Sequence, residues 1–498
     1  MRGDPPPAGE PSAAHVVAAE DGGPRRLHVL SPVFFAAGHA RRLWPVAIAV
    51  LAGRRLWLLG VGAVVLLAWT TLEWLRSTYR VEGGALRLEE GVLARKLRVI
   101  PFDRIQQVDL VRKPLHRLLG VATLRVDTAG GGGAAEVDLE VVRLREAQAL
   151  RSRLLRARAG AAAGGEEATA AAEAAPPERA LLRLSVGEVM LAGITGTRAA
   201  AVLVVLGPLS QLADWFPSLS DWLLRRFNPE SVAPTTPAAV LAVAVLAVAV
   251  WLGLAAASSV VTDFGFTLAT AAGDLVVRRG LLERREAVMP TARLQVVRVD
   301  ESLLRRALGL ASIRIQSAGR SGGSDETASR LTIPILPRSE VNRVLGELLP
   351  GAAPLPALRT PPPAARRRAM RRGVVMSAPL VLAVAAVLWA LSRPAAPTAL
   401  LLVPLAVLGG LAAYRSLGHA RRDGFLYARQ GAAIRVTAVV PVAKAQSGSV
   451  RSSVFQRRAG LATLHVDVAG GGPTPKVLDE AEATAEELLQ VVLGRSPG

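Results

Sequence analysis

The sequence contains no cysteine and few aromatic residues, and both shortages narrow what the chain can be. Without cysteine it forms no disulfides and offers no thiolate ligands to a metal. Aromatic residues make up only 4% of the 498 residues, although 51% are hydrophobic. The apolar content is therefore mainly Ala, Val and Leu. Much of it lies in long blocks, which indicates membrane-spanning helices.

Acidic residues are also in the minority, since 60 Lys and Arg face 40 Asp and Glu and leave a net charge of +20. A basic chain suits an anionic membrane surface or nucleic acid. In the alternative interpretation, the net positive charge reflects only an arginine-rich composition and the Arg residues that flank the apolar blocks. Nucleic-acid binding calls for basic stripes interleaved with stacking aromatics, which this sequence lacks. We therefore expect membrane lipids, and no nucleic acid, as partners.

One short segment occurs three times in the chain. Residues 120–132 read GVATLRVDTAGGG, residues 460–472 read GLATLHVDVAGGG, and residues 309–319 read GLASIRIQSAG. A proline lies 19 residues before the first glycine of every copy, as Pro101, Pro290 and Pro441. A spacing kept three times predicts one structural unit used three times.

Apolar stretches precede each of these units. A helix needs about 20 apolar residues to cross the hydrocarbon. The candidate spans are 56–75, 199–216, 238–258, 374–391 and 398–414, with a shorter sixth at 43–53. We expect the sixth to form a tight hairpin with 56–75, the alternative being an interfacial segment. The stretches 27–38 and 184–193 are expected to be helices lying in the membrane interface.

The spans come in pairs, so the three units fall on one face of the membrane. Arginines flanking the spans are more numerous on that face, above all in the run 366–372, and fewer in the opposite loops. The positive-inside rule then places the units in the cytoplasm.

Within each unit the apolar pattern changes once. Leu86 and Leu88 alternate with polar residues, as do Leu124 and Val126, which predicts strands with one buried face. An amphipathic helix then ends each unit. Its apolar stripes are Leu144, Ala147, Leu150 and Leu154, then Val341, Val344, Leu345 and Leu348, then Ala481, Ala485, Leu488 and Val492.

Residues 100–131, IPFDRIQQVDLVRKPLHRLLGVATLRVDTAGG, closely resemble the bacterial pleckstrin-homology-like (PH-like) domain of YdbS/YdbT-type membrane proteins. The R-[IL]-Q signature of that family matches residues 104–106 and 293–295. An L-x-R-x-[LA]-G segment follows from Leu115. The resemblance extends over roughly residues 26–495. The third copy departs from it, because AKAQSGSV (443–450) replaces DRIQQVDL of the first.

The resemblance implies a seven-stranded β-barrel closed by one C-terminal helix. The expected fold is mixed membrane α plus β, with about six transmembrane helices and three cytoplasmic PH-like β-barrels. The expected divisions are a disordered tail (1–25), an interfacial helix and transmembrane hairpin (26–76), PH-like domain 1 (77–158), a flexible linker (159–180), an interfacial helix and transmembrane pair (181–262), PH-like domain 2 (263–350), a Pro- and Arg-rich linker (351–372), a transmembrane pair (373–418) and a degenerate PH-like domain 3 (419–495).

The candidate binding residues are the two Arg-x-Gln pairs, Arg104 with Gln106 and Arg293 with Gln295. Residues two apart on a strand share one face. An Arg fork with a neighbouring amide would bind a phosphate-bearing lipid head group or a partner strand. In the alternative interpretation both side chains are structural, capping the open edge of the barrel and bonding backbone carbonyls.

No residue pattern predicts catalysis. The six His are scattered and none pairs with carboxylates at metal-ligand spacing, and His116 is expected to be a surface or half-buried turn residue. The run Gly130–Gly133 lacks the Lys-Ser/Thr of a phosphate-binding loop, so a hairpin turn is expected. We therefore expect no enzyme, no cofactor and no metal.

The function expected from these features is that of a non-enzymatic, multi-pass protein of a bacterial cytoplasmic membrane. Its PH-like domains would be binding or oligomerisation modules at the membrane surface, with self-association or a small membrane protein as partners besides lipids. The family resemblance adds a role in envelope-stress defence. The alternative is a transporter or export accessory with regulatory PH-like domains. Charge inside the spans would mark its path, and only Glu73 and Arg198, both near span ends, are found.

Overall fold

The computed structural model describes residues 25–40, 43, 56–82, 84–92, 94–102, 105–128, 137–163, 178–196, 237–271, 273–318, 330–391, 393–470 and 472–494. The predicted span 199–216 and nearly all of 43–53 lie outside these residues, as does the predicted tail up to residue 24. The chain divides into two compact units. Residues 1–131 and 135–176 form the first, and residues 132–134 and 177–498 form the second.

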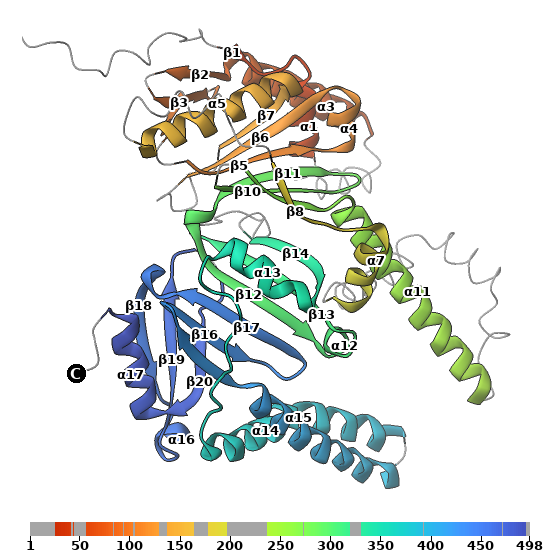
Figure 1. The fold of residues 1–498 in the computed structure, drawn as a ribbon. Coiled ribbons are helices and arrows are strands. Elements are labelled where there is room, and N and C mark those ends of the chain that lie inside the picture. Colours follow the sequence, from red (N-terminus) through yellow and green to blue (C-terminus); the bar gives the residue numbers. More distant parts are fainter. Residues whose placement is uncertain are drawn as a thin grey trace, which may run out of the picture. The chain divides into compact units, whose positions relative to one another are not determined.

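The first unit holds one PH-like domain, made of two antiparallel sheets and a helix (Figure 1). The first sheet has the strand order β1 (Arg25–Arg26), β2 (Thr78–Glu82), β3 (Ala85–Glu90), β4 (Lys96–Pro101). The second sheet contains β5 (Ile105–Arg112), β6 (Val121–Thr128) and β7 (Val137–Arg143), which pair in that order, and helix α5 (Leu144–Ala163) follows them. Leu86, Leu88, Leu124 and the helix stripe of Ala147, Leu150 and Leu154 form the shared core, as their spacing predicted.

The second unit holds two more domains of the same plan. Domain 2 comprises β8 (Arg179–Arg183), β9 (Thr267–Ala271), β10 (Asp274–Arg279) and β11 (Arg284–Pro290), then η3 (Thr291–Arg293), β12 (Leu294–Ser302), α12 (Leu303–Ala307), β13 (Leu310–Ser317), β14 (Arg330–Pro337) and α13 (Arg338–Leu348). Domain 3 comprises β15 (Gly418–Arg422), β16 (Phe425–Gln430), β17 (Ile434–Pro441), η5 (Val442–Lys444), β18 (Ala445–Arg451), α16 (Val454–Arg457), β19 (Leu461–Val468), β20 (Lys476–Ala481) and α17 (Glu482–Val492).

The membrane helices are inserted inside each domain, between its first strand and its second. In domain 1, β1 pairs with β2 across the intervening helices. In domain 2, β8 pairs with β9 in the same way. In domain 3, Arg359 and His419 form a backbone bridge, with N–O distances of 2.7 and 3.1 Å. The segment before each apolar stretch thus completes the first sheet, although the sequence indicated tail, linker or the start of a membrane segment there. Both ends of the inserted helices are thereby fixed to one domain.

Four described helical segments are long and apolar enough to cross a membrane. They comprise α3 (Leu56–Arg76), α11 (Pro237–Asp263), α14 (Pro363–Leu391), and residues 396–416, which join η4 (Arg393–Leu401) to α15 (Leu402–Ser416). The stretches 27–38 and 184–193, which were expected to be helical, overlap α1 (Ser31–Ala40) and α7 (Val186–Thr195). Their place in the membrane interface stays a prediction. Helix α7 packs closely on α11, because a Cβ added to Gly193 would lie 2.4 Å from the carbonyl oxygen of Ala255.

Helices α14 and α15 also meet through glycine. A Cβ added to Gly410 would lie 2.5 Å from the carbonyl oxygen of Ala369, and one added to Gly373 would lie 2.5 Å from that of Ala406. Small residues let membrane helices approach until their backbones touch, which is the main source of packing energy between helices in lipid. The two glycines therefore define the crossing point of this helical hairpin.

Domains 2 and 3 share one continuous sheet. Strand β12 of domain 2 pairs with β17 of domain 3, which gives the order β14-β13-β12-β17-β16-β15, while β18-β19-β20 form a separate sheet. Val297 and Val439 face each other across this junction, and both are fully buried. The strands of domains 2 and 3 therefore do not form the two separate closed barrels that the sequence led us to expect. The outer edge of β17 is already occupied by β12.

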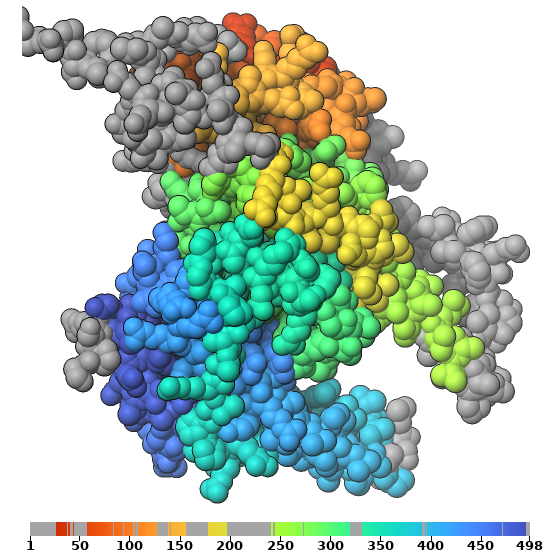
Figure 2. Space-filling model, viewed as in Figure 1, coloured from red at the N-terminus to blue at the C-terminus, as the bar shows by residue number. Residues whose placement is uncertain are grey.

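The outer face of the first sheet of domain 3 completes the core of domain 2. Tyr427 and Val439 belong to that core, and the Tyr427 hydroxyl donates to the carbonyl oxygen of Ala352 at 2.6 Å. Neighbouring Leu426 and Val440 point the other way, into the core of domain 3. In Figure 2 the teal surface of domain 2 and the blue surface of domain 3 lie directly against each other.

We predict that Gly410→Leu separates α14 from α15. The added side chain would overlap the backbone of Ala369, so the helices must move apart and lose their closest contacts. We expect a loss of about 1–3 kcal/mol, measured as a lower unfolding temperature in detergent. Gly409→Leu is the matched control, since a Cβ there meets nothing within 4 Å. Equal stability of the two variants would contradict the assigned crossing point.

We predict that Val439→Lys disrupts the junction of domains 2 and 3, because an ammonium group would be buried without a partner. Val99 lies two residues before Pro101 as Val439 does before Pro441, yet it is 49% exposed. Val99→Lys is therefore the control. We expect the first variant to lose several kcal/mol of unfolding free energy, of order 3, and the second to lose little. Denaturant titration followed by domain-specific proteolysis measures both.

Candidate functional site

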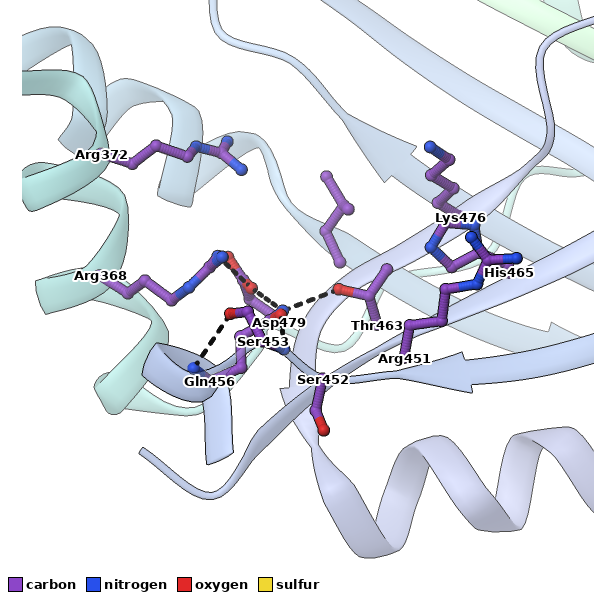
Figure 3. Close-up of a pocket in the computed structure, with 11 residues that line it drawn as sticks. Arg368, Arg372, Arg451, Ser452, Ser453, Gln456, Thr463, His465, Lys476 and Asp479 are labelled. Carbon is purple, nitrogen blue, oxygen red and sulfur yellow. Dashed lines mark hydrogen bonds and ion pairs between the residues drawn. The ribbon is translucent and has the colours of Figure 1, made fainter. Parts of the chain in front are cut away.

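A basic pocket lies in domain 3, where α14 meets the second sheet of the domain (Figure 3). Its volume is about 320 Å³, near the lower end of the range for small-ligand sites. Arg368 and Arg372 extend into it from α14, and the strands and the turn of domain 3 supply the rest. The remaining lining residues are Arg451, Ser452, Ser453, Gln456, Thr463, His465, Lys476, Leu478 and Asp479.

The base of the pocket is a closed polar network around Asp479. Both carboxylate oxygens of Asp479 accept from the Arg368 guanidinium, at 2.5 and 2.6 Å. The Gln456 amide nitrogen donates to Asp479 at 2.8 Å and to the Thr463 hydroxyl at 2.9 Å. The Gln456 side-chain oxygen accepts from the backbone N–H of Ser453 at 3.0 Å. Asp479 is only 1% exposed. Its charge is therefore fully neutralised inside the protein.

Three further cations line the pocket without such compensation. Among the residues that the structure describes, Arg372, Arg451 and Lys476 have no carboxylate within ion-pair distance. Arg372 and Arg451 are exposed and Lys476 is half-buried. With the Arg368–Asp479 pair neutral, the pocket carries an excess of three positive charges. Such a concentration of like charge favours an anionic ligand.

His465 stands on β19 beside these cations. Burial lowers its pKa below the usual 6.5, and the charges of Lys476 and Arg451 lower it further, while Asp467 acts weakly the other way. The imidazole is therefore neutral at pH 7. A neutral ring can donate one hydrogen bond and accept another, and it gains a full charge when an anion draws a proton onto it.

The first predicted pair of site residues cannot be compared with this pocket. Arg104 lies outside the described residues. Gln106 lies on β5, at an irregularity in the pairing between Ile105 and Gln107. Their proposed role stays a prediction.

The second predicted pair lies at the start of β12, away from the lining of the pocket. Arg293 ends the 3₁₀ turn η3 and Gln295 sits at a β-bulge between Leu294 and Val296. Strand β12 begins only at Leu294, so the two-residue strand periodicity does not extend back to Arg293. Gln295 is buried, and its side-chain nitrogen donates to the carbonyl oxygen of Arg293 at 3.4 Å. This contact favours the structural alternative for Gln295.

The pocket residues were not singled out from the sequence, although a signal was present. The basic run 366–372 was identified only as arginines that flank a span, and His465 only as one of six scattered histidines. The sequence could not predict that these residues come together in one pocket. They belong to α14, β18, β19 and β20, and Arg368 and Asp479 are more than 100 residues apart in the chain. Among the described residues no three His, Cys, Asp or Glu lie together as a metal site would require.

Comparison with known proteins agrees with the repeated architecture. A family model described as the bacterial PH domain matches residues 31–158, 224–352 and 374–493. The chain is 26% identical over 424 residues to the UPF0699 transmembrane protein YdbT of Bacillus subtilis, an alignment that covers 82% of this chain and 83% of that protein. No solved structure matches the chain. Three matches that together cover most of its length, each on one of the repeated domains, show that the chain belongs to the bacterial PH domain family.

Proposed function

We propose that this protein is a non-enzymatic, multi-pass membrane protein that binds the phosphate of an anionic lipid head group in the basic pocket of domain 3. The observation that carries the proposal is a cluster of three cations without carboxylate partners among the described residues, Arg372, Arg451 and Lys476. They lie next to the start of the apolar stretch of α14. The bilayer would be crossed by six spans, with all PH-like domains on the cytoplasmic face of a bacterial membrane, as the arginine distribution favours.

The donor set of the pocket fits a phosphate better than a carboxylate. Arg372 and Arg451 offer planar guanidinium forks, and Lys476 adds a third charge from β20. The hydroxyls of Ser452 and Ser453 and the ring of His465 line the same space. The phosphodiester of a lipid head group is tetrahedral, so its two free and two ester oxygens can contact donors that converge from several directions, whereas a planar carboxylate meets mainly those in its plane.

The position of the pocket favours a lipid over a free anion. Arg368 and Arg372 belong to α14, whose apolar stretch starts at Gly373. Arg366, Arg367 and Arg371 are exposed on the same turns. A basic run immediately before a span lies at the level of the phosphates in a bilayer, where anionic lipids gather. The pocket therefore opens where head groups are most concentrated.

We predict that Arg372→Ala and Arg451→Ala each weaken retention of phosphatidylglycerol by roughly tenfold, since each removes one charge-assisted contact. The full chain is reconstituted in nanodiscs of phosphatidylcholine with phosphatidylglycerol, and the lipid kept by the protein is counted by native mass spectrometry. Inorganic phosphate is added as a competitor. If inorganic phosphate displaces the lipid when its concentration only equals that of phosphatidylglycerol, the ligand is a free anion.

Arg421→Ala is the matched control for these variants. Arg421 is exposed on β15 of the same domain and does not line the pocket. Its substitution therefore removes one positive charge without changing the pocket. We expect its lipid retention to equal that of the wild type. If all three variants lose lipid equally, the attraction is a general effect of net charge. If none does, the pocket does not bind head groups.

We predict that head-group binding strengthens as the pH falls from about 7 to about 5, the range in which histidine titrates. In the empty pocket the pKa of His465 lies below 6.5. A bound anion raises this pKa, so binding takes up a proton between the two values and the affinity rises as the pH drops through that window. Below the lower pKa the affinity becomes constant.

His465→Gln should remove this pH dependence while leaving binding at pH 7 nearly unchanged. Phosphatidylglycerol is the suitable probe, because its phosphodiester keeps a single charge over this range. The retained lipid is compared across the pH series for wild type and variant. A pH dependence that persists in His465→Gln would assign the titration to another group.

A further inference from the structure

The three domains share a short helix that no function has yet accounted for. Helices α4 (Pro114–Leu118), α12 and α16 each follow the first strand of a second sheet and return to the next strand through a glycine of positive φ, Gly120, Gly309 or Gly460. This is the L-x-R-x-[LA]-G segment that marks the family resemblance in the first two copies.

Each of these helices exposes large apolar side chains. Leu118 is 83% exposed, Leu303 61% and Phe455 74%. The full sets are Leu115, Leu118 and Leu119 on the first, Leu303, Leu304 and Leu308 on the second, and Val454 and Phe455 on the third. Single exposed apolar residues are ordinary on protein surfaces. Clusters of two or three, at the same place in three domains, call for a partner surface.

One residue of each short helix points inward and joins it to a helix of the membrane segment. His116 is buried, unlike the surface or half-buried residue expected, and its ring meets Phe34 of α1 edge-on, with ring centres 4.6 Å apart. Arg305 donates to the Thr195 hydroxyl of α7 at 3.1 Å. Gln456 bonds Asp479, which holds Arg368 of α14. The exposed residues are thus anchored beside the spans.

Basic residues accompany the apolar ones. Lys113 is exposed next to α4, and Arg457 and Arg458 are exposed on and after α16. Apolar side chains flanked by Lys and Arg are the pattern of segments that enter the boundary between head groups and acyl chains. The long cationic side chains can then reach the phosphates while the apolar groups lie deeper.

We propose that α4, α12 and α16 are tips that insert their exposed Leu and Phe side chains into the interface of the bilayer that the neighbouring helices cross. The third copy supplies the most telling observation. It has lost the Arg and the aliphatic residue of the R-[IL]-Q signature, yet it keeps an apolar tip in Val454 and Phe455. This inference stands apart from the pocket, because none of the exposed tip residues lines it.

The absence of cysteine makes a direct test available. Leu118→Cys, Leu304→Cys and Phe455→Cys are made one at a time in the full chain, spin-labelled, and reconstituted in phosphatidylcholine–phosphatidylglycerol nanodiscs. We expect the tip labels to be accessible to oxygen, which concentrates in the bilayer, and shielded from a water-soluble nickel chelate. Glu487→Cys, at an exposed position of α17, is the control and should show the reverse.

Two results would overturn the proposal. Tip labels as accessible to the nickel chelate as the label at Glu487 would show that the tips stay in water. Spectral broadening between tip labels that disappears on dilution with unlabelled protein would identify a second copy of the chain as the partner. All three positions are exposed, so labelling should not prevent folding, and unchanged circular dichroism checks this for each variant.

Discussion

An open edge of a β-sheet must be covered or made unattractive, and this requirement governs the arrangement of domains 2 and 3. A strand edge presents a row of unpaired backbone groups that will pair with any available strand. In the second unit, β12 and β17 satisfy each other, and the six-stranded sheet that results carries apolar residues on both faces. The outer face of domain 3's first sheet then becomes part of domain 2's core. Two repeats are thereby fused into one folded body.

The same requirement explains why the third repeat diverged. Strand β18 occupies in domain 3 the place that β12 occupies in domain 2, and among the described residues it pairs only with β19. Its sequence AQSGSVR is polar and has no buried residue, whereas β12 reads LQVVRVDES and is buried almost throughout. Ser, Gly and a terminal Arg discourage pairing at a free edge. The copy that departs from the family signature thus has a polar strand that faces water at the place where domain 2 has a buried strand.

Domain 1 shows the corresponding adaptation on its first sheet. Arg87 stands at the position that Tyr427 fills in domain 3, counted from the proline that follows. It bonds Glu82 at 3.2 Å, and Arg80 bonds Glu89 at 3.1 Å on the same face. Exposed ion pairs of this kind add little stability. They place charge on this face, beside the exposed Leu97 and Val99 of β4, whereas the equivalent face of domain 3 is apolar because another domain packs on it.

Local features of the fold followed from sequence periodicity, and long-range ones did not. The stripe Val341, Val344, Leu345 and Leu348 predicted α13 and its buried face, because burial on one side of a helix leaves a repeat of three and four. The inserted position of the membrane helices was missed, since β1 and the Arg359 bridge are too short to show a strand period. The β12–β17 pairing joins strands some 130 residues apart, and no local pattern records it.

The Arg368–Asp479 pair decides which cations of the pocket are free to hold a ligand. Asp479 is buried, and removing one partner of a buried ion pair costs about 3–5 kcal/mol because the remaining charge is left uncompensated. A single charge-assisted contact to a ligand returns about 1.5–3 kcal/mol. In the proposed complex Arg368 would therefore stay on Asp479, and the anion would be held by Arg372, Arg451 and Lys476. Since Gln456 bonds the same carboxylate, Asp479 links α16, the pocket and the start of α14.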